Sequence, residues 1–234
     1  MIKVVNFTRK FKEKVAVNNL SIEVKRGCIC GFIGHNGAGK TTTIKSIVGI
    51  NNDYEGEILI NDISVKNYPN RVKKIIAYIP DNPDIYDFMK GIDYLNFIAD
   101  AYQMTYSKRK KLIEKYASLF GMENVLNDLV SSYSHGMKQK LVIISAFIHE
   151  PKVLILDEPF VGLDPKASHI LKKLMKEMCE NGGSIFYSTH VLEVAQNLCD
   201  NLVIIKNGEL IVSGETNDVL KDKSLETLFL ELTE

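Results

Sequence analysis

Residues 34–42 read Gly34-His35-Asn36-Gly37-Ala38-Gly39-Lys40-Thr41-Thr42, which is the pattern G-x-x-x-x-G-K-[ST]. The apolar run 28–33 before it indicates a short strand, and 42–50 after it has the pattern of a helix. This is the context that a phosphate-binding loop requires. The alternative is an ordinary glycine-rich turn. Residue frequencies produce the motif by chance in only about 1% of chains of this length, so the phosphate-binding interpretation is favoured.

The glycines of this loop let the backbone wrap tightly, so that successive N–H groups point at one anion. The helix that follows adds its positive N-terminal end. Lys40 is expected to reach the β- and γ-phosphates, and the Thr41 hydroxyl is expected to ligate Mg²⁺. The motif therefore predicts a site for a nucleotide polyphosphate with its metal ion.

The composition is that of an ordinary globular protein of 234 residues, long enough for one α/β domain with a small subdomain. Equal numbers of basic and acidic residues, 29 each, give a net charge of zero, so we expect no nucleic-acid partner. No apolar run approaches the roughly 20 residues that span a bilayer, and residues 1–26 do not resemble a signal peptide. The four cysteines lack metal or redox spacing, which favours a reducing cytosol.

Patterns along the chain predict a mixed α/β fold. The runs 2–8 and 16–24 alternate as antiparallel strands do, 55–65 indicates a strand with an Asn61-Asp62 turn, and 72–79 a helix end followed by a strand. The four apolar residues 153–156 indicate a strand buried on both faces. Helix 166–180, strand 184–188, a hairpin around Asn207-Gly208 and short helical pieces over 216–234 complete the pattern.

The segment between these strands is expected to be helical. From 86 to 127 apolar residues recur at three- and four-residue spacing, with Tyr94, Phe97, Ile98 and Ala101 as one stripe, and 135–149 is a second helix. We therefore expect residues 82–150 to be a helical subdomain, inserted between 1–81 and 151–234, which form the core and an antiparallel β subdomain. The basic run 108–111 within it is interpreted as a solvated helix face, with a docking site as the alternative.

Two acids, Asp157 and Glu158, stand at the end of the buried strand, where α/β sheets place their ligands. A carboxylate at Asp157 suits Mg²⁺, directly or through water. Glu158 is placed to polarise an attacking water as a general base. Two unrelated loop acids would be the alternative, and the phosphate-binding pattern upstream argues against it.

With these residues the sequence resembles the ATP-binding subunits of ABC transporters over nearly its whole length. The loop 34–41 matches the family's Walker A motif and 153–158 its Walker B strand, and 133–139 stands where the family has its L-S-G-G-Q signature. Residues 162–165, Gly-Leu-Asp-Pro, match the D-loop, and 188–190, Ser-Thr-His, match the segment that carries the switch histidine. The order and spacing of these motifs together are highly specific.

The resemblance implies a P-loop NTPase fold with ATP and Mg²⁺ as cofactors, and it implies site residues. Glu158 and His190 are the expected catalytic residues, His190 contacting the γ-phosphate and helping to hold Glu158 and the water. Thr41, Asp157 and Asp81 are the expected metal ligands. The expected nucleotide contacts are Phe11, Gly34, Asn36, Gly37, Ala38, Gly39, Lys40, Thr41, Thr42, Ser134, Gly136 and Asp164. Phe11 is expected to stack on adenine, with a place in the hydrophobic core as the alternative.

The chain departs from the family pattern in two places. Tyr133, His135 and Met137 replace the leucine, the first glycine and the glutamine of the signature, whereas Ser134 and Gly136 are kept. Asp81 stands where the family has the glutamine of its Q-loop. A second Mg²⁺ carboxylate at Asp81 and a simple turn residue within 80–83 remain equal alternatives.

The resemblance implies ATP hydrolysis that drives a membrane transporter, with two ATP-binding subunits, identical or paralogous, paired head to tail. Because no membrane segment is recognised, we expect docking on a separate transmembrane subunit at the cytoplasmic face of the cell membrane. The loop 34–42 and the segment 162–165 resemble the drug, peptide and antibiotic exporter branch. A soluble ABC ATPase not coupled to transport, and an ATP-binding switch without turnover, remain alternatives.

Overall fold

The computed structural model describes residues 1–233, and it confirms the α/β prediction. Its centre is a six-stranded sheet in the order β10-β9-β3-β8-β7-β6. The strands from β9 to β6 are parallel, and β10 pairs antiparallel to β9 across the expected hairpin. The bounds of these strands are β3 Ile29–Ile33, β6 Ile76–Ile79, β7 Val153–Asp157, β8 Ser184–Thr189, β9 Asn201–Lys206 and β10 Glu209–Glu215.

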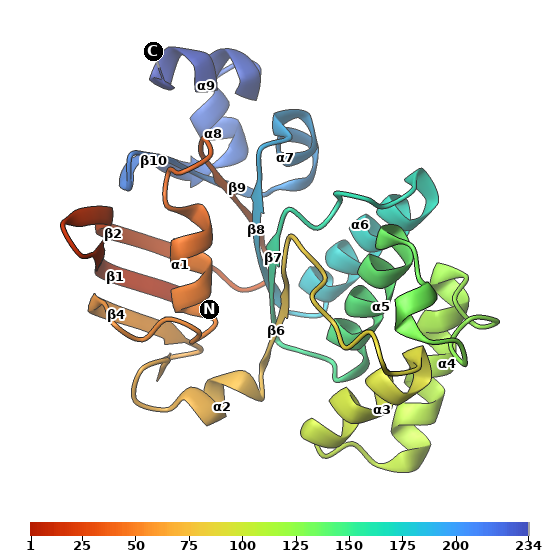
Figure 1. Ribbon diagram of the computed structural model, residues 1–234. Helices are drawn as coiled ribbons and strands as arrows, with labels where there is room; N and C mark the ends of the chain where they lie inside the picture. The colour runs from red at the N-terminus through yellow and green to blue at the C-terminus, as the bar shows by residue number, and fades with distance from the viewer. Residues whose placement is uncertain (234) are drawn as a thin grey trace.

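A second, antiparallel sheet of four strands lies beside this core (Figure 1). Its strands follow the order β2-β1-β4-β5, and β4 and β5 are joined by the predicted turn at Asn61-Asp62. The bounds are β1 Ile2–Phe11, β2 Lys14–Val24, β4 Glu55–Ile60 and β5 Ile63–Ser64. The first strand is therefore longer than the alternation in 2–8 indicates.

Helices cover the six-stranded sheet and fill the interval between β6 and β7 (Figure 1). Their bounds are α1 Lys40–Ile47, α2 Pro69–Lys73, α3 Gly91–Ala101, α4 Tyr106–Phe120, the 3-10 turn Val130–Ser132, α5 His135–Ile148, α6 Pro165–Glu180, α7 Leu192–Leu198, α8 Thr216–Leu220 and α9 Leu225–Thr233. Helices α3 to α5 thus fall within the 82–150 range predicted for a helical insertion. Every residue from 141 to 148 of α5 is buried, so α5 is the central helix of this block.

The five parallel strands of this sheet are buried on both faces, because successive side chains point to opposite sides and each side meets an apolar cluster. In β7, Leu154 and Leu156 join a cluster with α4, α5 and α6, whereas Val153 and Ile155 join a cluster with α1 and the antiparallel sheet. This arrangement explains the unbroken apolar run that predicted the strand. It leaves the ends of the strands as the places where polar side chains can gather.

Three details differ from the sequence-based expectations. Residues 86–90 are not helical, since α3 begins at Gly91. The buried face of α3 is formed by Gly91, Leu95 and Ala99, whereas Phe97 and Ala101 of the predicted stripe are exposed. The helical period is as predicted, but the buried face is displaced around the helix from this stripe, of which Tyr94 and Ile98 are only partly buried. Helix α1 ends at Ile47, three residues before the predicted end.

Three residues of the basic run 108–111 are exposed on α4, as expected for a solvated helix face, and Arg109 is half-buried. Lys108 pairs with Glu150, Arg109 with Asp100 and Lys110 with Glu114 one turn away on the same helix. These ion pairs neutralise much of the run, and exposed pairs of this kind contribute little to stability. The structure therefore favours the solvated interpretation over a basic docking site.

Candidate functional site: a phosphate-binding loop beside two acids and a histidine

The loop 34–39 connects β3 to α1 at the carboxyl ends of the parallel strands, where open α/β sheets bind their ligands. Gly39 is the N-cap of α1, with φ of 105° in the left-handed region. A Cβ atom there would lie 2.8 Å from Val17 Cγ2 and 2.9 Å from the Ala16 carbonyl oxygen of β2. A glycine is therefore required at this position by both its backbone angle and the close approach of β2. The first N–H groups of α1 remain directed into the loop.

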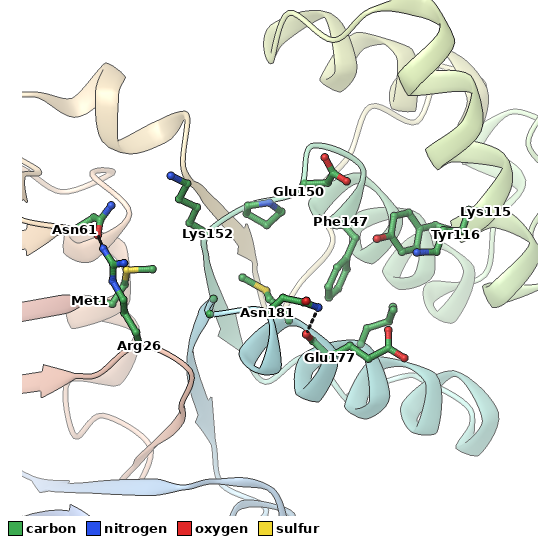
Figure 2. A pocket seen from close by; sticks show the side chains of 15 residues that line it. Met1, Arg26, Asn61, Lys115, Tyr116, Phe147, Glu150, Lys152, Glu177 and Asn181 are labelled. Atoms are coloured by element: carbon green, nitrogen blue, oxygen red, sulfur yellow. Dashed lines mark hydrogen bonds between the residues drawn. The ribbon is translucent and has the colours of Figure 1, made fainter.

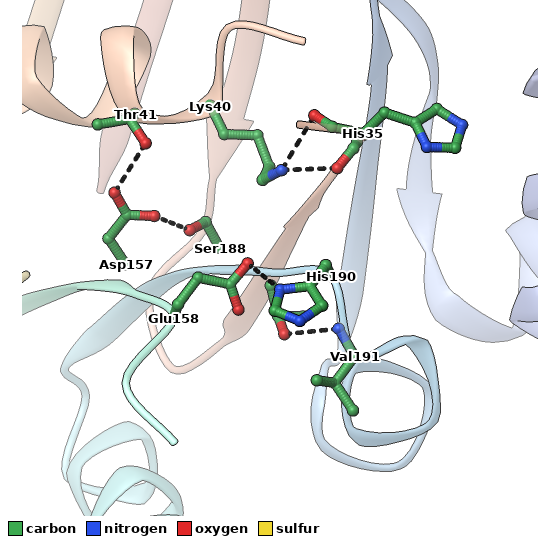
Figure 3. A network of polar contacts seen from close by, with 10 residues as sticks. His35, Lys40, Thr41, Asp157, Glu158, Ser188, His190 and Val191 are labelled. Atoms are coloured by element: carbon green, nitrogen blue, oxygen red, sulfur yellow. Dashed lines mark hydrogen bonds and ion pairs between the residues drawn. The ribbon is translucent and has the colours of Figure 1, made fainter. Parts of the chain in front are cut away.

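The ammonium group of Lys40 lies inside the loop. Its Nζ donates hydrogen bonds to the carbonyl oxygen of Gly34, at 2.6 Å, and to that of His35, at 3.2 Å (Figure 3). Only 7% of the residue is exposed, and burial lowers its pKa, whereas the nearby Glu158 and Asp157 act in the opposite direction. The cation is therefore held where it can meet an anion bound by the loop.

Asp157 is a buried carboxylate held by two hydroxyl groups. Thr41 Oγ1 donates to Oδ2 at 3.0 Å, and Ser188 Oγ donates to Oδ1 (Figure 3). The side chain is almost wholly buried, at 2% exposure. The site thus offers oxygen donors alone, the type that Mg²⁺ prefers, and Mg²⁺ commonly takes one or two carboxylates and completes its shell with phosphates and water. Residues 1–233 hold no group of three or more His, Cys, Asp or Glu side chains placed to hold a metal ion.

Glu158 has an unusual backbone conformation, with φ of 49°. Its N–H donates to the Ser188 carbonyl oxygen at 3.1 Å. Its Oε1 lies 2.8 Å from His190 Nδ1 (Figure 3). Because an ionised carboxylate only accepts, Nδ1 is the donor, and Nε2 is left for another partner. Left-handed conformations of residues other than glycine are costly and cluster at functional sites. Here the conformation directs the second acid toward the histidine.

A pocket of about 510 Å³ collects most of the predicted nucleotide contacts. Its lining includes Phe11, Asn36, Gly37, Gly39, Lys40, Thr41, Thr42, Asp81, Asp157 and Glu158. Phe11 is 46% exposed, so its alternative place in the hydrophobic core is wrong, and the Arg9 guanidinium lies 4.6 Å from the centre of its ring. Asp81 is exposed, and its Oδ1 accepts from the Asn82 N–H, as a turn residue does.

Sequence reasoning missed other residues of this pocket. Lys14, Val15 and Ala16 of β2 and Asn207 of the β9–β10 hairpin also line it. The hairpin is held there by two backbone bonds: the Asn18 N–H donates to Gly208 O, and the Gly208 N–H donates to Ala38 O. The Asn-Gly pair signalled the hairpin, but no local signal shows that a hairpin near the end of the chain reaches a loop near its beginning.

A second pocket of similar volume lies at the opposite, amino ends of the strands (Figure 2). Its lining mixes cations and anions, among them Arg26, Lys152, Glu150 and Glu177. The Arg26 guanidinium is already paired with the Asn61 side chain at 2.6 Å. Neither a phosphate-binding loop nor a hydroxyl-bound acid is present in its lining, so the pocket around Lys40 is the candidate site.

The segments 133–139 and 162–165 lie apart from that pocket, because none of their residues lines it. Ser134 caps α5 by accepting from the Met137 N–H, and Asp164 caps α6 by accepting from the Ala167 N–H at 2.8 Å. A Cβ atom on Gly136 would lie 2.7 Å from the Gly162 carbonyl oxygen, so the two segments touch. They form a second polar surface of the same chain that presents the N-terminal ends of two helices.

Tyr133 precedes Ser134 in the chain, and Lys140 pairs with Asp164. Tyr133 is buried, and its hydroxyl donates to the Val125 carbonyl oxygen at 2.6 Å, so this departure from the signature is a packing residue of the helical block. The Lys140 ammonium lies 2.6 Å from Asp164 Oδ2 and is the main reason why the pKa of Asp164 is lowered. Sequence reasoning did not single out Lys140.

Comparisons with known proteins identify the family of this chain. The model of the family described as "ABC transporter" matches residues 17–161. The chain belongs to the ABC transporter family. It is 34% identical over its full length to the ABC-type transporter ATP-binding protein EcsA of Bacillus subtilis (strain 168), covering 96% of that protein. It is thus an ABC ATP-binding subunit of a transporter, from a family that binds ATP and generally hydrolyses it.

Further ABC relatives agree. The ABC transporter ATP-binding protein NatA of the same organism is 30% identical over 97% of the chain and 95% of its own length. A solved ATP-binding subunit of an ABC transporter is 34% identical, with a TM-score of 0.96 and full coverage of both chains. A dimeric bacterial ABC transporter cassette at 22% identity shares the fold with a TM-score of 0.84. Among residues 1–233 of this ABC subunit, no helix is both long and apolar enough to cross a membrane.

Proposed function

We propose that this ABC subunit hydrolyses MgATP and that the cycle powers export through a separate transmembrane subunit. The observation that carries the proposal is the 2.8 Å contact between Glu158 and His190, next to an Asp157 that Thr41 holds at 3.0 Å. A chain that only bound ATP would need the loop and Asp157, but it would not need a second acid and a histidine held together beside them. The set therefore supports turnover over a silent ATP-binding switch.

In this proposal each side chain has one role. The loop N–H groups and Lys40 bind the β- and γ-phosphates. Thr41 and Asp157 hold Mg²⁺, which when bound neutralises charge on the phosphate oxygens. Glu158 takes the proton of the attacking water, and His190 orients Glu158 through Nδ1 and offers Nε2 to the γ-phosphate. Phe11, exposed at the rim, stacks on adenine.

The surface formed by 133–139 and 162–165 is proposed to complete the site of a second ATP-binding subunit. Ser134, Gly136 and Asp164 do not reach the Lys40 pocket of their own chain. A helix N-terminus is an anion site, and α5 starts directly after Ser134. Head-to-tail pairing brings that end to the γ-phosphate of the other subunit's ATP, so each nucleotide lies between two chains.

The transmembrane subunit is proposed to dock on an aromatic cluster made of Tyr86, Phe88 and Phe97. These side chains are 51%, 79% and 49% exposed, and the ring of Tyr86 lies 5.6 Å from that of Phe88 and 6.1 Å from that of Phe97. Adjacent exposed aromatic rings mark interaction sites. The loop that carries two of them begins at Asp81, in the nucleotide pocket, so docking and nucleotide binding share one segment. We propose that this docking takes place at the cytoplasmic face of the membrane.

Export is favoured over import by one relative. The linearmycin resistance ATP-binding protein LnrL of Bacillus subtilis (strain 168) is 30% identical over 94% of the chain and 70% of its own length. Resistance to an antibiotic is a property of that protein. For this chain it supports an outward direction of transport. The transported substrate would be selected by the membrane subunit.

Two measurements test the proposal. Steady-state phosphate release by the purified chain with MgATP separates an ATPase from a silent switch. Co-purification of a membrane protein from detergent extracts, compared between wild type and Phe88→Ser, separates a transporter subunit from a free ATPase. Tyr106→Ser is the matched control, because Tyr106 is also an exposed aromatic, at 75%, but lies outside the cluster. No phosphate release, or equal capture by both variants, would contradict the respective part.

A further inference from the structure

Ser188 is a fully buried serine near the end of β8, and the role proposed for the site does not account for it. In the parallel pairing of β7 with β8, Asp157 stands opposite Ser188. Paired residues on neighbouring strands direct their side chains to the same face of the sheet. The hydroxyl of Ser188 therefore meets the carboxylate of Asp157 because of strand register alone.

The contacts of Ser188 reach both acids of the site. Its Oγ donates to Asp157 Oδ1 (Figure 3). Its carbonyl oxygen accepts the N–H of Glu158 at 3.1 Å. The other oxygen of Asp157, Oδ2, accepts from Thr41 Oγ1 at 3.0 Å. One residue thus holds the side chain of the first acid and the strained backbone of the second.

We infer that Ser188 is a positioning residue that fixes the orientation of the Asp157 carboxylate for the metal bound with ATP. With Oδ1 engaged by Ser188, the carboxylate cannot rotate freely in its buried place, and Oδ2 stays on the side of Thr41. Removing a side chain that holds a metal ligand in its orientation typically lowers metal affinity or activity by about 10- to 100-fold. This inference rests on the proposed Mg²⁺-dependent nucleotide site.

Ser188→Ala separates the two contacts of the residue, because it removes the hydroxyl and keeps the carbonyl that holds Glu158. The strand itself offers a matched control. Ser184 lies on the same strand, is also fully buried, and donates one hydrogen bond, to the Lys25 carbonyl oxygen at 2.8 Å. Ser184→Ala therefore imposes the same loss of one buried hydroxyl at the end of the strand away from the site.

The readout is binding of a fluorescent ATP analogue, titrated once in EDTA and once in Mg²⁺. We expect Ser188→Ala to bind the analogue as tightly as wild type does in EDTA. In Mg²⁺ we expect its affinity to be about 10-fold lower than that of wild type. Ser184→Ala is expected to keep the full gain, although both variants lose thermal stability. An equal Mg²⁺-dependent gain in wild type and Ser188→Ala overturns the inference.

Two further variants keep the test decisive if Ser188→Ala does not fold. Ser188→Thr keeps a hydroxyl donor and is expected to keep most of the Mg²⁺ gain. Ser188→Cys keeps the size but donates only weakly, so we expect it to lose the gain. A Ser188→Cys protein with wild-type behaviour would show that size, not the hydrogen bond, matters. If wild type itself shows no Mg²⁺-dependent gain, the proposed function fails, which is a separate result from an unchanged Ser188→Ala.

Discussion

Glu158 Oε1 and His190 Nδ1 lie 2.8 Å apart, although 32 residues separate them in the chain. Glu158 is largely buried, with 16% of its side chain exposed, whereas 60% of the His190 side chain is exposed. The acid is therefore fixed by its surroundings, and the histidine is the partner that can respond to a ligand. This asymmetry makes Glu158 the candidate base and His190 the group that aligns it.

Replacing Glu158 by glutamine should nearly stop turnover and leave ATP binding intact. The amide keeps the size of the side chain but cannot take a proton, and loss of a general base costs at least about 10²-fold. Phosphate release and equilibrium binding of ATP are the two measurements. Glu180→Gln, an exposed position at the end of α6, serves as the control. Phosphate release near the wild-type rate would remove Glu158 from the mechanism.

The same Glu158→Gln protein should become dimeric with MgATP and remain monomeric with ADP. Ser134 and Gly136 lie outside the Lys40 pocket of their own chain and require the γ-phosphate of a second subunit in the head-to-tail model. Light scattering at saturating nucleotide measures the mass. A protein that stays monomeric at saturating MgATP would count against head-to-tail pairing.

Lys40→Ala should weaken nucleotide binding itself. A charge-assisted contact to phosphate is worth roughly 1.5–3 kcal/mol, which corresponds to a loss of affinity of about 10- to 150-fold. Lys45→Ala is the matched control, because Lys45 is exposed on the same helix and does not line the pocket. Calorimetry with ATP gives both affinities. Equal affinities for wild type and Lys40→Ala would rule out Lys40 as a phosphate ligand.

Lys140→Ala should lower the stability of the folded state by an amount that depends on pH. The hydrogen bond from Lys140 is the largest cause that lowers the pKa of Asp164 below 3.8. A lowered pKa of an acid stabilises the folded state above the unfolded pKa, and this contribution is lost as the pH falls through the folded pKa. The gap in stability between wild type and variant should therefore be full at neutral pH and shrink below about pH 3.8.

The size of that gap is limited, because Asp164 is half exposed and exposed ion pairs contribute only about 0–1 kcal/mol. Thermal unfolding across the pH range measures it. Lys173→Ala is the control, since Lys173 and Glu177 form an exposed ion pair within α6, with Lys173 Nζ 3.8 Å from Glu177 Oε1. A gap that grew toward low pH would mean that Lys140 does not act through the charge of Asp164.

The parts of the fold that sequence predicted are those specified by local pattern. The strand, loop and helix around Lys40 follow from glycine spacing and apolar runs, and so does the hairpin at Asn207-Gly208. The contact of Ser188 with Asp157 could not be predicted, because it depends on which strands pair and in which register. The same holds for contacts between distant segments, such as Gly136 against Gly162. The left-handed backbone of Glu158 likewise has no local signal, since glutamate does not favour it.

Asp81 has features of both a metal ligand and a turn residue. The side chain lines the pocket with Thr41, Asp157 and Glu158, as a metal ligand should, and it also accepts a bond from Asn82 N–H, as a turn residue does. If Asp81 supplies a second carboxylate through water, Asp81→Ala should raise the Mg²⁺ concentration for half-maximal ATPase activity by about 10-fold. Asp81→Gln should keep most of the turnover, because the longer amide can reach the same water.

Asp84→Ala is the matched control for that titration, because Asp84 lies in the same loop but does not line the nucleotide pocket. Removing Asp84 should leave the Mg²⁺ curve unchanged while altering the loop to a similar degree. An Asp81→Ala protein with the same Mg²⁺ curve and maximal rate as Asp84→Ala would assign Asp81 to the turn. The loop would then act through its aromatic cluster alone, since Tyr86 and Phe88 lie in the same loop as Asp81 and are exposed.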